Sequence, residues 1–254
     1  MKIVVLIKQV PDTAEERRLS PDTGRVDREA TDPVIDEITE RALELALTVK
    51  DRDKSTEVVV ATMGPADAAK SIRKALSMGA DSGIHILDDS LAGADMVLTA
   101  ATLAAALRDT GADLVIAGNE STDGRAGMIP AMIAEHLGLP LLGSLVSAEI
   151  GGDAVAGVRL SEVGTQEVTA SYPAVLTVTE RFEEARFPNF KGIMGAKRKP
   201  LATISAADLG VSAQVRSTVL DVAQRPPRTA GRKIVDDGNA AAELVDFLAA
   251  RRLI

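Results

Sequence analysis

The chain has 254 residues, of which 46% are hydrophobic, and it carries a formal net charge of −8 with a pI near 5.0. This acidic balance argues against general nucleic-acid binding, and the absence of Cys excludes disulfides, thiolate metal sites and a cysteine nucleophile. No apolar run reaches the length of a membrane span and Met1 leads directly into a strand-like segment, so we expect a cytoplasmic protein that does not insert into membranes.

The first 140 residues predict parallel strands with helices between them. Four short apolar segments have the composition of buried strands, at residues 2–8, 58–61, 84–87 and 114–117. Helical patterns separate and follow these segments, beginning near residues 33, 66, 93 and 129. Asp32 and Pro33 have the residue types of an N-cap and a first helical position, so they predict the start of the first helix. The alternation predicts an α/β fold with a doubly wound, mainly parallel, Rossmann-like sheet.

After Leu141 the pattern changes to short β segments. The sequence predicts a hairpin around residues 151–153, an alternating segment at 167–171 and a buried strand at 174–178. We expect these segments to be antiparallel edge strands added to the same sheet.

The sequence predicts one α/β domain, residues 1–210, followed by a C-terminal arm, residues 211–254. The arm contains Pro226 and Pro227 and ends in a helix with apolar residues on one side. An arm without its own core usually packs on another subunit, and packing back onto the parent domain is the alternative.

The stretch from Asp113 to Pro140 combines a buried strand, a small polar loop and a helix. The free N–H groups at the start of such a helix favour an anion, usually a phosphate. The loop lacks both common phosphate fingerprints, so an ordinary turn in which Thr122 or Asp123 caps the helix is the alternative. Ligands of doubly wound sheets bind at the carboxyl ends of the strands. At the neighbouring strand ends, Val10 and Met63 could sandwich a flat ring, which together with a phosphate suggests an adenine nucleotide.

A second candidate surface lies at residues 182–200. It holds Phe182, Phe187 and Phe190, followed by a cluster of Lys and Arg side chains. Pro188 and Gly192 discourage regular structure, so we expect part of this segment to be a surface loop that binds a partner. The alternative is that the phenylalanines cover the edge of the core and the cations form a solvated face.

The sequence shows no Ser/His/Asp set, metal-binding cluster or carboxylate dyad. His85 and His136 are isolated, and structural roles are expected for both. We therefore expect no enzymatic activity of the chain by itself. A stand-alone protein that binds or hydrolyses adenine nucleotides, of the stress-protein kind, is one alternative, although it would not need the long arm. A purely structural subunit with an empty crevice is another.

Several segments carry a resemblance that runs in order along essentially the whole chain. They are residues 8–12, 32–42, 64–65, 72–81, 118–127, 184–188, 193–200 and 228–231. With these segments the chain resembles the β subunit of electron transfer flavoprotein, including its FixA-type relatives. The basic segment from Ile193 to Pro200 is the most specific part of the match.

The resemblance implies a heterodimer in which the α subunit holds most of the FAD, at its junction with the β subunit. It also implies that the β subunit binds AMP as a structural ligand in the crevice described above. The implied ligand positions are Leu6, Lys8, Val10, Asp32, Met63, Gly118, Asn119, Glu120, Ser121, Thr122, Asp123, Gly124, Arg125, Ala126 and Gly127.

The resemblance further implies that electrons come from flavin-dependent dehydrogenases of the acyl-CoA type, as in fatty acid β-oxidation, and pass to a membrane quinone oxidoreductase. Phe190 occupies the place where the family's docking anchor is commonly Leu. The implied docking positions are Arg186, Phe187, Pro188, Phe190, Ile193, Met194, Lys197, Arg198 and Lys199. From about Ser212 onward, the arm would wrap the α subunit.

Two departures from the family pattern affect these expectations. Thr13 and Val34 stand where many members have aromatic residues near the flavin, so the contribution of this chain to flavin packing is in question. The loop at residues 122–127 is shorter than in many members. Electron-bifurcating relatives usually carry a longer loop and hold a second FAD in this crevice. The short loop therefore favours AMP over a second FAD.

Overall fold

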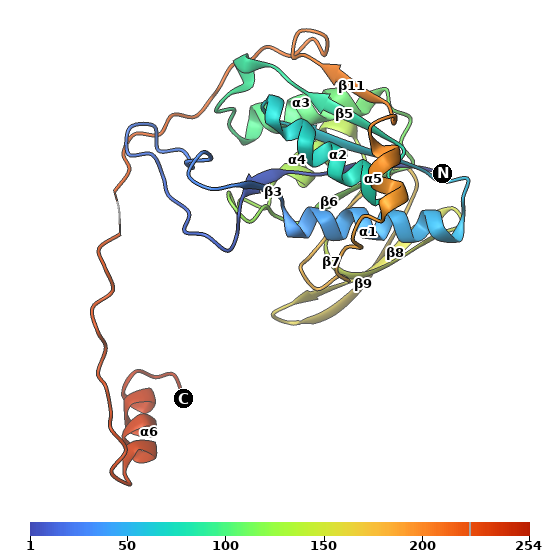
Figure 1. Cartoon of the computed structure of the whole chain (residues 1–254). Coiled ribbons are helices and arrows are strands. Elements are labelled where there is room, and N and C mark those ends of the chain that lie inside the picture. Colours follow the sequence, from blue (N-terminus) through green and yellow to red (C-terminus); the bar gives the residue numbers. More distant parts are fainter. Residues whose placement is uncertain (224) are drawn as a thin grey trace. The chain divides into compact units, whose positions relative to one another are not determined.

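A nine-stranded sheet organises the larger of the two units of the chain (Figure 1). The computed structural model describes residues 1–223 and 225–254, and its units are Met1–Leu220 and Asp221–Ile254. The strand order is β11-β5-β4-β1-β6-β10-β7-β8-β9. The strands are β1 (Lys2–Leu6), β4 (Glu57–Met63), β5 (Ser82–Ile86), β6 (Leu114–Gly118), β7 (Leu141–Gly151), β8 (Ala154–Ser161), β9 (Gly164–Ser171), β10 (Ala174–Val178) and β11 (Leu201–Ile204).

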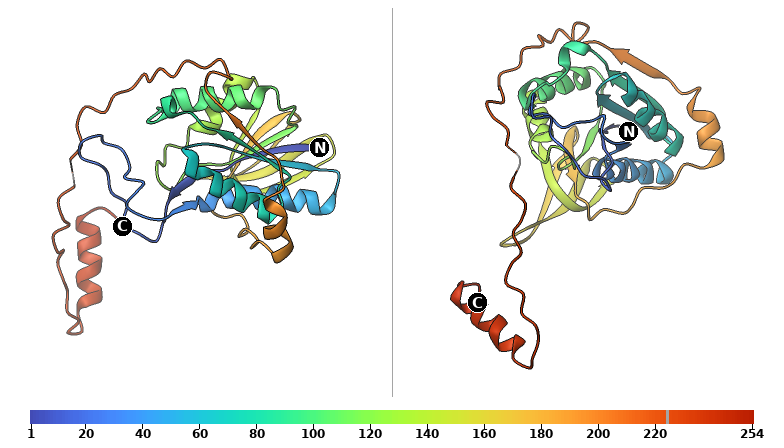
Figure 2. Two further views of the ribbon diagram at one scale, coloured as in Figure 1. Left: turned by 45° about the horizontal axis from the view of Figure 1, so that its top comes forward. Right: turned by 60° about the vertical axis from the view of Figure 1, so that its left-hand side comes forward.

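Helices cover both faces of this sheet (Figure 2). The side chains of a strand alternate between faces, and in β1 Ile3 and Val5 join one buried cluster while Val4 and Leu6 join the other. The first cluster includes α1 (Glu37–Arg52) and α2 (Ala69–Met78), and the second includes α3 (Met96–Arg108) and α4 (Ile129–Leu137). Two short 3-10 helices, η1 (Ala66–Ala68) and η2 (Asp89–Leu91), precede α2 and α3. The doubly wound, mainly parallel fold is confirmed.

The predicted start of the first helix at Asp32 is wrong. Pro33–Ile35 forms strand β3, which pairs antiparallel with β2 (Gln9–Pro11), so that Val34 lies opposite Val10. The helix begins instead at Glu37, because the Asp36 side chain accepts the N–H of Ile38 at 3.0 Å and acts as the N-cap. Proline is tolerated in an edge strand as well as in the first turn of a helix, so Pro33 by itself is compatible with either structure.

The expectation that the late strands are all antiparallel edge strands is wrong for β10. This strand lies between β6 and β7 and is parallel to both. All five of its residues are buried, which requires cover on both faces and neighbours on both sides. The other late strands do form an antiparallel extension, since β7 pairs with β8 and β8 with β9.

Part of the segment at residues 182–200 is helical rather than a loop. Helix α5 spans Phe190–Ala196, and the Asn189 side chain caps it by accepting the N–H of Gly192 at 2.8 Å. Strand β11 then pairs parallel with β5 at the edge of the sheet. Gly192, which was expected to discourage regular structure, therefore lies inside this helix.

The smaller unit, residues 221–254, contains helix α6 (Ala240–Ala250). Residues 211–223 and 225–236 carry no helix or strand, and Gln224 of the predicted arm lies outside the described residues. The guanidinium of Arg251, the residue directly after α6, lies 5.3 Å from the centre of the Phe247 ring in that helix. Leu244, Val245 and Phe247 are exposed. Among the described residues, no helix is long and apolar enough to cross a membrane.

Replacing Leu176 in β10 with Ala should destabilise the larger unit by about 2–5 kcal/mol, because the fully buried side chain lies opposite Ile116 and Leu142. The change in the midpoint of thermal unfolding measures this effect. Leu160→Ala on β8 is the matched control, since that side chain is 44% exposed and its loss should change the midpoint little. Equal effects of the two substitutions would contradict the central position of β10.

Candidate functional site

The loop Gly118–Gly127 lies at the carboxyl end of β6 and leads toward α4. Its entry is fixed because Asn119 N–H donates to the Val178 carbonyl of β10 at 2.8 Å. Inside the loop, Arg125 N–H donates to the Ser121 carbonyl at 2.9 Å. Arg125 and Gly127 both have positive φ angles, of 48° and 64°. The backbone is thus folded into a tight turn between strand and helix.

Asp36 ties this loop to the start of α1. Its fully buried carboxylate accepts the Thr122 N–H at 2.6 Å and the Thr122 hydroxyl at 2.7 Å, in addition to the N–H of Ile38. The Asp36 N–H donates to the Lys8 carbonyl at 2.9 Å. A buried carboxylate requires such donors, because burying an unpaired charge is costly. Asp36 was not among the predicted site residues, although the acidic side chains of Glu37 and Glu40 in the first helical turn signalled a cap there.

The side chain of Asp123 is buried and paired with two cations. Its oxygens lie 2.7 Å from Lys8 Nζ and 2.6 Å from an Arg28 guanidinium nitrogen, and its side chain has no exposed area. Burial raises the pKa of this carboxyl, but the charge of Lys8, hydrogen bonds from Lys8 and Ser121 and the charge of Arg28 outweigh it and leave the pKa well below its usual value. Neither Thr122 nor Asp123 caps α4, whose N-cap position is Met128, without a side-chain hydrogen bond.

A segment from Asp12 to Asp32, which we call the strap, contacts this loop through two arginines. Arg28 binds Asp123, and the Arg17 guanidinium donates to the Thr122 carbonyl. The strap contains an isolated antiparallel bridge between Leu19 and Val26. No local sequence pattern indicates these contacts, because Arg17 and Arg28 lie in a polar segment that resembles any solvated surface.

The remaining predicted ligand positions surround the same strand ends. Leu6 and Val10 are buried, Met63 is half-buried and Asp32 is exposed. Among the described residues, the buried Asn119 Oδ1 has no hydrogen-bond partner. A bound group with an N–H donor, such as the amino group of adenine, would satisfy this oxygen, so the residues present fit an adenine nucleotide.

The segment at residues 182–200 is fastened to α1 by Arg186. Its guanidinium binds Glu44 through two nitrogens, at 2.9 Å and 2.7 Å, and Asp51 at 2.7 Å. Burial raises the pKa of Glu44, but hydrogen bonds and the charge of Arg186 outweigh this effect and leave the pKa below its usual value. The pKa of Arg186 is raised, chiefly by its hydrogen bonds to Glu44. This predicted docking residue therefore makes strong intramolecular contacts in the chain.

Hydrogen bonds to backbone carbonyls at or just past the C-terminal ends of α2 and α5 join these two helices. Arg73 of α2 donates to the carbonyls of Ala196 and Lys199 at 2.8 Å and 2.9 Å. In return, Lys199 Nζ donates to the carbonyls of Leu76, at 2.8 Å, and Ala80. Cations at the carbonyl end of a helix also interact favourably with its dipole. Burial lowers the pKa of Lys199, as expected for a partly buried amine.

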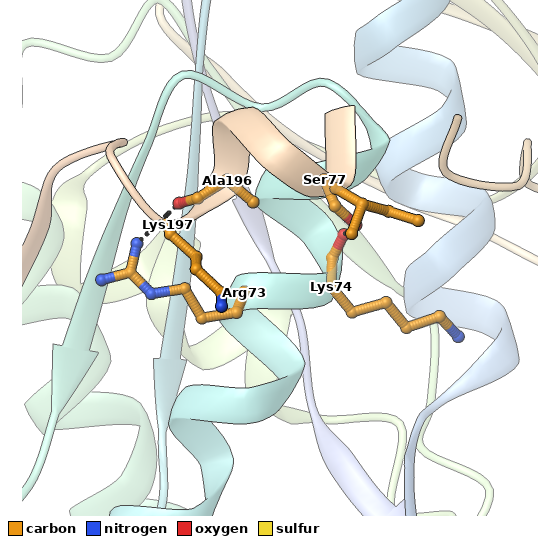
Figure 3. Close-up of a pocket in the computed structure, with 6 residues that line it drawn as sticks. Arg73, Lys74, Ser77, Ala196 and Lys197 are labelled. Atoms are coloured by element: carbon orange, nitrogen blue, oxygen red, sulfur yellow. Dashed lines mark hydrogen bonds between the residues drawn. The ribbon is translucent and has the colours of Figure 1, made fainter. Parts of the chain in front are cut away.

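A pocket of about 470 Å³ lies where α2 and α5 meet (Figure 3). Figure 3 shows the hydrogen bond from Arg73 to the Ala196 carbonyl on one side and Lys74 extending away on the other. The lining residues are Arg73, Lys74, Ser77, Ile193, Ala196 and Lys197. The backbones of α2 and α5 lie close together at Gly192, where an added Cβ would lie 2.1 Å from the Ser77 carbonyl oxygen.

These contacts leave two phenylalanines in solvent. Phe187 is 93% exposed and Phe190 is 80% exposed, and Ile193 and Met194 of α5 are also exposed. Phe182 differs, because it is half-buried and packs against the core on the α1 and α2 side. The core-covering interpretation thus holds for Phe182, whereas Phe187 and Phe190 are both exposed.

The two histidines lie apart from these regions. His85 is buried in β5, with its Nε2 atom 3.1 Å from the Gly64 carbonyl oxygen, and His136 lies on the surface of α4. In the part of the chain that the structure describes, no group of three or more His, Asp or Glu side chains could hold a metal ion.

Comparison with known proteins places these features in a family context. The sequence profile described as "Electron transfer flavoprotein domain" matches residues 23–209. The chain is 46% identical to the "Electron transfer flavoprotein subunit beta" of Mycobacterium tuberculosis, over 99% of both chains. It is 34% identical to the protein of the same name from Syntrophomonas wolfei, over 95% of this chain and 93% of that one. It is also 35% identical to the "Caffeyl-CoA reductase-Etf complex subunit CarD" of Acetobacterium woodii, over 84% and 81%.

Replacing Gly192 with Ala should push α5 away from α2, because the new methyl group would overlap the Ser77 carbonyl. We expect a loss of about 1–3 kcal/mol in stability and faster hydrogen exchange at residues 187–199. Gly195→Ala in the same helix is the matched control, since a Cβ there meets no described atom within 4 Å. Identical exchange in the two variants would argue against a close contact at Gly192.

Proposed function

The chain belongs to the electron transfer flavoprotein family, among its β subunits, and from this premise we propose that it forms a heterodimer with an α subunit that holds most of the FAD. When bound, the flavin supplies the electron-transfer chemistry. The β chain encloses one side of this cofactor and brings donor dehydrogenases close to it. Donors of the acyl-CoA dehydrogenase type would deliver electrons, and a quinone oxidoreductase would receive them.

The crevice at the carboxyl ends of β1, β4 and β6 would hold AMP as a structural ligand. The buried, unpartnered Asn119 Oδ1 supports a ligand that donates a hydrogen bond, and Lys8 and Arg28 supply positive charge beside the loop. Val10 and Met63 would pack on the base. No step of electron transfer depends on this nucleotide, whose role is to stabilise the loop and the strand ends around it.

Donor docking would take place at α5 and the residues before it. The observation that carries this proposal is the exposure of Phe187 and Phe190 on a segment that Arg186, Arg73 and Lys199 hold against α1 and α2. Aromatic anchors contribute most to binding when they are exposed before docking and fixed in place, because little side-chain entropy is then lost. The exposed apolar residues of α6 would in turn pack on the α subunit.

A second FAD in place of AMP is the competing ligand. The observation that favours a second FAD is the similarity of the chain to a protein named as a subunit of a caffeyl-CoA reductase–Etf complex. A stand-alone nucleotide hydrolase has less support. The candidate crevice offers Lys8, Arg28 and Asp123, but the carboxylate is already bound to the two cations.

Mass spectrometry of the purified heterodimer under non-denaturing conditions should find one AMP and one FAD for each pair of chains. Removing AMP should lower the thermal unfolding midpoint, and adding it back should restore the midpoint, because a ligand that binds only the folded state stabilises it. Two FAD molecules and no AMP would instead support the bifurcating type. A heterodimer with no nucleotide besides FAD would support a purely structural subunit.

Phe190→Ala should lower the kcat/KM for electron transfer from an acyl-CoA dehydrogenase by about tenfold or more, and Phe190→Asp should lower it further, because an apolar anchor is lost or replaced by a charge. Phe187→Ala tests the more exposed neighbour in the same way. Val163→Ala, at a side chain that is 94% exposed beyond β8, should have no effect. Unchanged rates and donor affinity in both Phe190 variants would rule out the anchor role.

A further inference from the structure

The phosphate-binding part of the proposed crevice already contains an anion. The Asp123 carboxylate lies in the middle of the loop, bound to Lys8 Nζ, to the Arg28 guanidinium and, at 2.7 Å, to the N–H of Gly124. One ammonium group, one guanidinium group and one backbone N–H thus converge on a single pair of oxygens. Convergent donors of these three kinds also typically bind a phosphate group.

The ion pairs of Asp123 with Lys8 and Arg28 differ from ordinary surface ion pairs because the carboxylate is buried. The Asp123 side chain has no exposed area, whereas those of Lys8 and Arg28 are 40% and 47% exposed. Solvent and an entering ligand can therefore reach the cations from the side away from the carboxylate. An anion that enters from that side meets Lys8 and Arg28 first and competes with Asp123 for their hydrogen bonds.

Arg28 lies on the strap, far in sequence from the nucleotide loop, and the strap is attached to the loop a second time through Arg17 and the Thr122 carbonyl. The Arg17 contact involves a backbone oxygen, so it does not compete with a ligand phosphate. The strap can therefore remain in place whether Arg28 binds Asp123 or a phosphate.

We propose that Lys8 and Arg28 form the cationic pair for the phosphate of the nucleotide, and that Asp123 is an internal counter-anion which holds this pair in position when no nucleotide is bound. This inference rests on the proposed nucleotide crevice. It adds Arg28 of the strap as a phosphate-binding residue and makes Asp123 a determinant of specificity. A ligand must carry an anion strong enough to displace a carboxylate, which favours a phosphorylated nucleotide over the nucleoside.

The test compares the binding of AMP with the binding of adenosine to the nucleotide-depleted heterodimer. Calorimetric titration gives both affinities, thermal unfolding gives the stabilisation by each ligand, and flavin absorbance verifies assembly. The variants are Asp123→Asn, which removes the counter-anion, Arg28→Gln, which removes a cation, and Arg28→Lys, which keeps the charge. Arg18→Gln is the control, because Arg18 is a neighbouring strap arginine paired with Glu16 at the surface.

Asp123→Asn should lower the unfolding midpoint of the nucleotide-free protein, because the buried carboxylate loses its ion pairs with Lys8 and Arg28, yet raise the affinity for AMP by about tenfold. Arg28→Gln should lower the affinity for AMP by about tenfold, and Arg28→Lys should lower it less. The affinity for adenosine should stay within about twofold of the wild-type value in each variant.

Weaker or unchanged AMP binding by Asp123→Asn, or equal effects on AMP and adenosine, would overturn the counter-anion role. If Asp123→Asn cannot assemble, unchanged AMP affinity in Arg28→Gln still overturns the cationic pair. A wild-type heterodimer that binds neither AMP nor adenosine overturns the proposed crevice together with this role. A wild type that binds AMP while the variants show no change overturns this role alone.

Discussion

The buried carboxylate of Asp36 is the group on which the arrangement of the loop Gly118–Gly127 depends. It joins residues 86 positions apart, by accepting both the N–H and the hydroxyl of Thr122 while it caps α1. These donors compensate for the burial of a charge, and they set the distance between the loop after β6 and the start of the helix. Because the Asp36 N–H also binds the Lys8 carbonyl, the loop, the helix and the end of β1 are fixed by one residue.

Helix α1 connects the two proposed working regions of the chain. Its 16 residues span about 24 Å. Asp36 at its start holds the nucleotide loop, and Glu44 and Asp51 farther along hold Arg186 at the beginning of the docking segment. The nucleotide crevice and the exposed phenylalanines are therefore both positioned by one rigid element.

The sequence was sufficient for the features that depend on local pattern. Short apolar runs and turn glycines predict the order of the first strands and helices, because each depends on a few neighbouring residues, whereas the predicted cap at Asp32 lies four residues before the true N-cap, Asp36. The position of β10 could not be read in this way, since the pattern of Ala174–Val178 specifies burial but not which strands lie beside it. Helix α5 was missed for a related reason. Gly192 lowers helix propensity, yet close contact with Ser77 requires a residue without a side chain. The contacts of Arg17 and Arg28 depend on tertiary folding of a polar segment and leave no local signal.

The insertion of β10 between β6 and β7 also has a consequence for synthesis of the chain on the ribosome. Until residues 174–178 have left the exit tunnel, β6 lacks one of its two neighbours, and the edge it presents can pair with any other unpaired strand. Pairing of β6 on both sides must therefore wait until residue 178 of 254 has been made, and the nascent N-terminal part passes through a stage that favours association with other chains. Chaperone demand during translation should therefore be greatest in the interval between the emergence of β6 and that of β10.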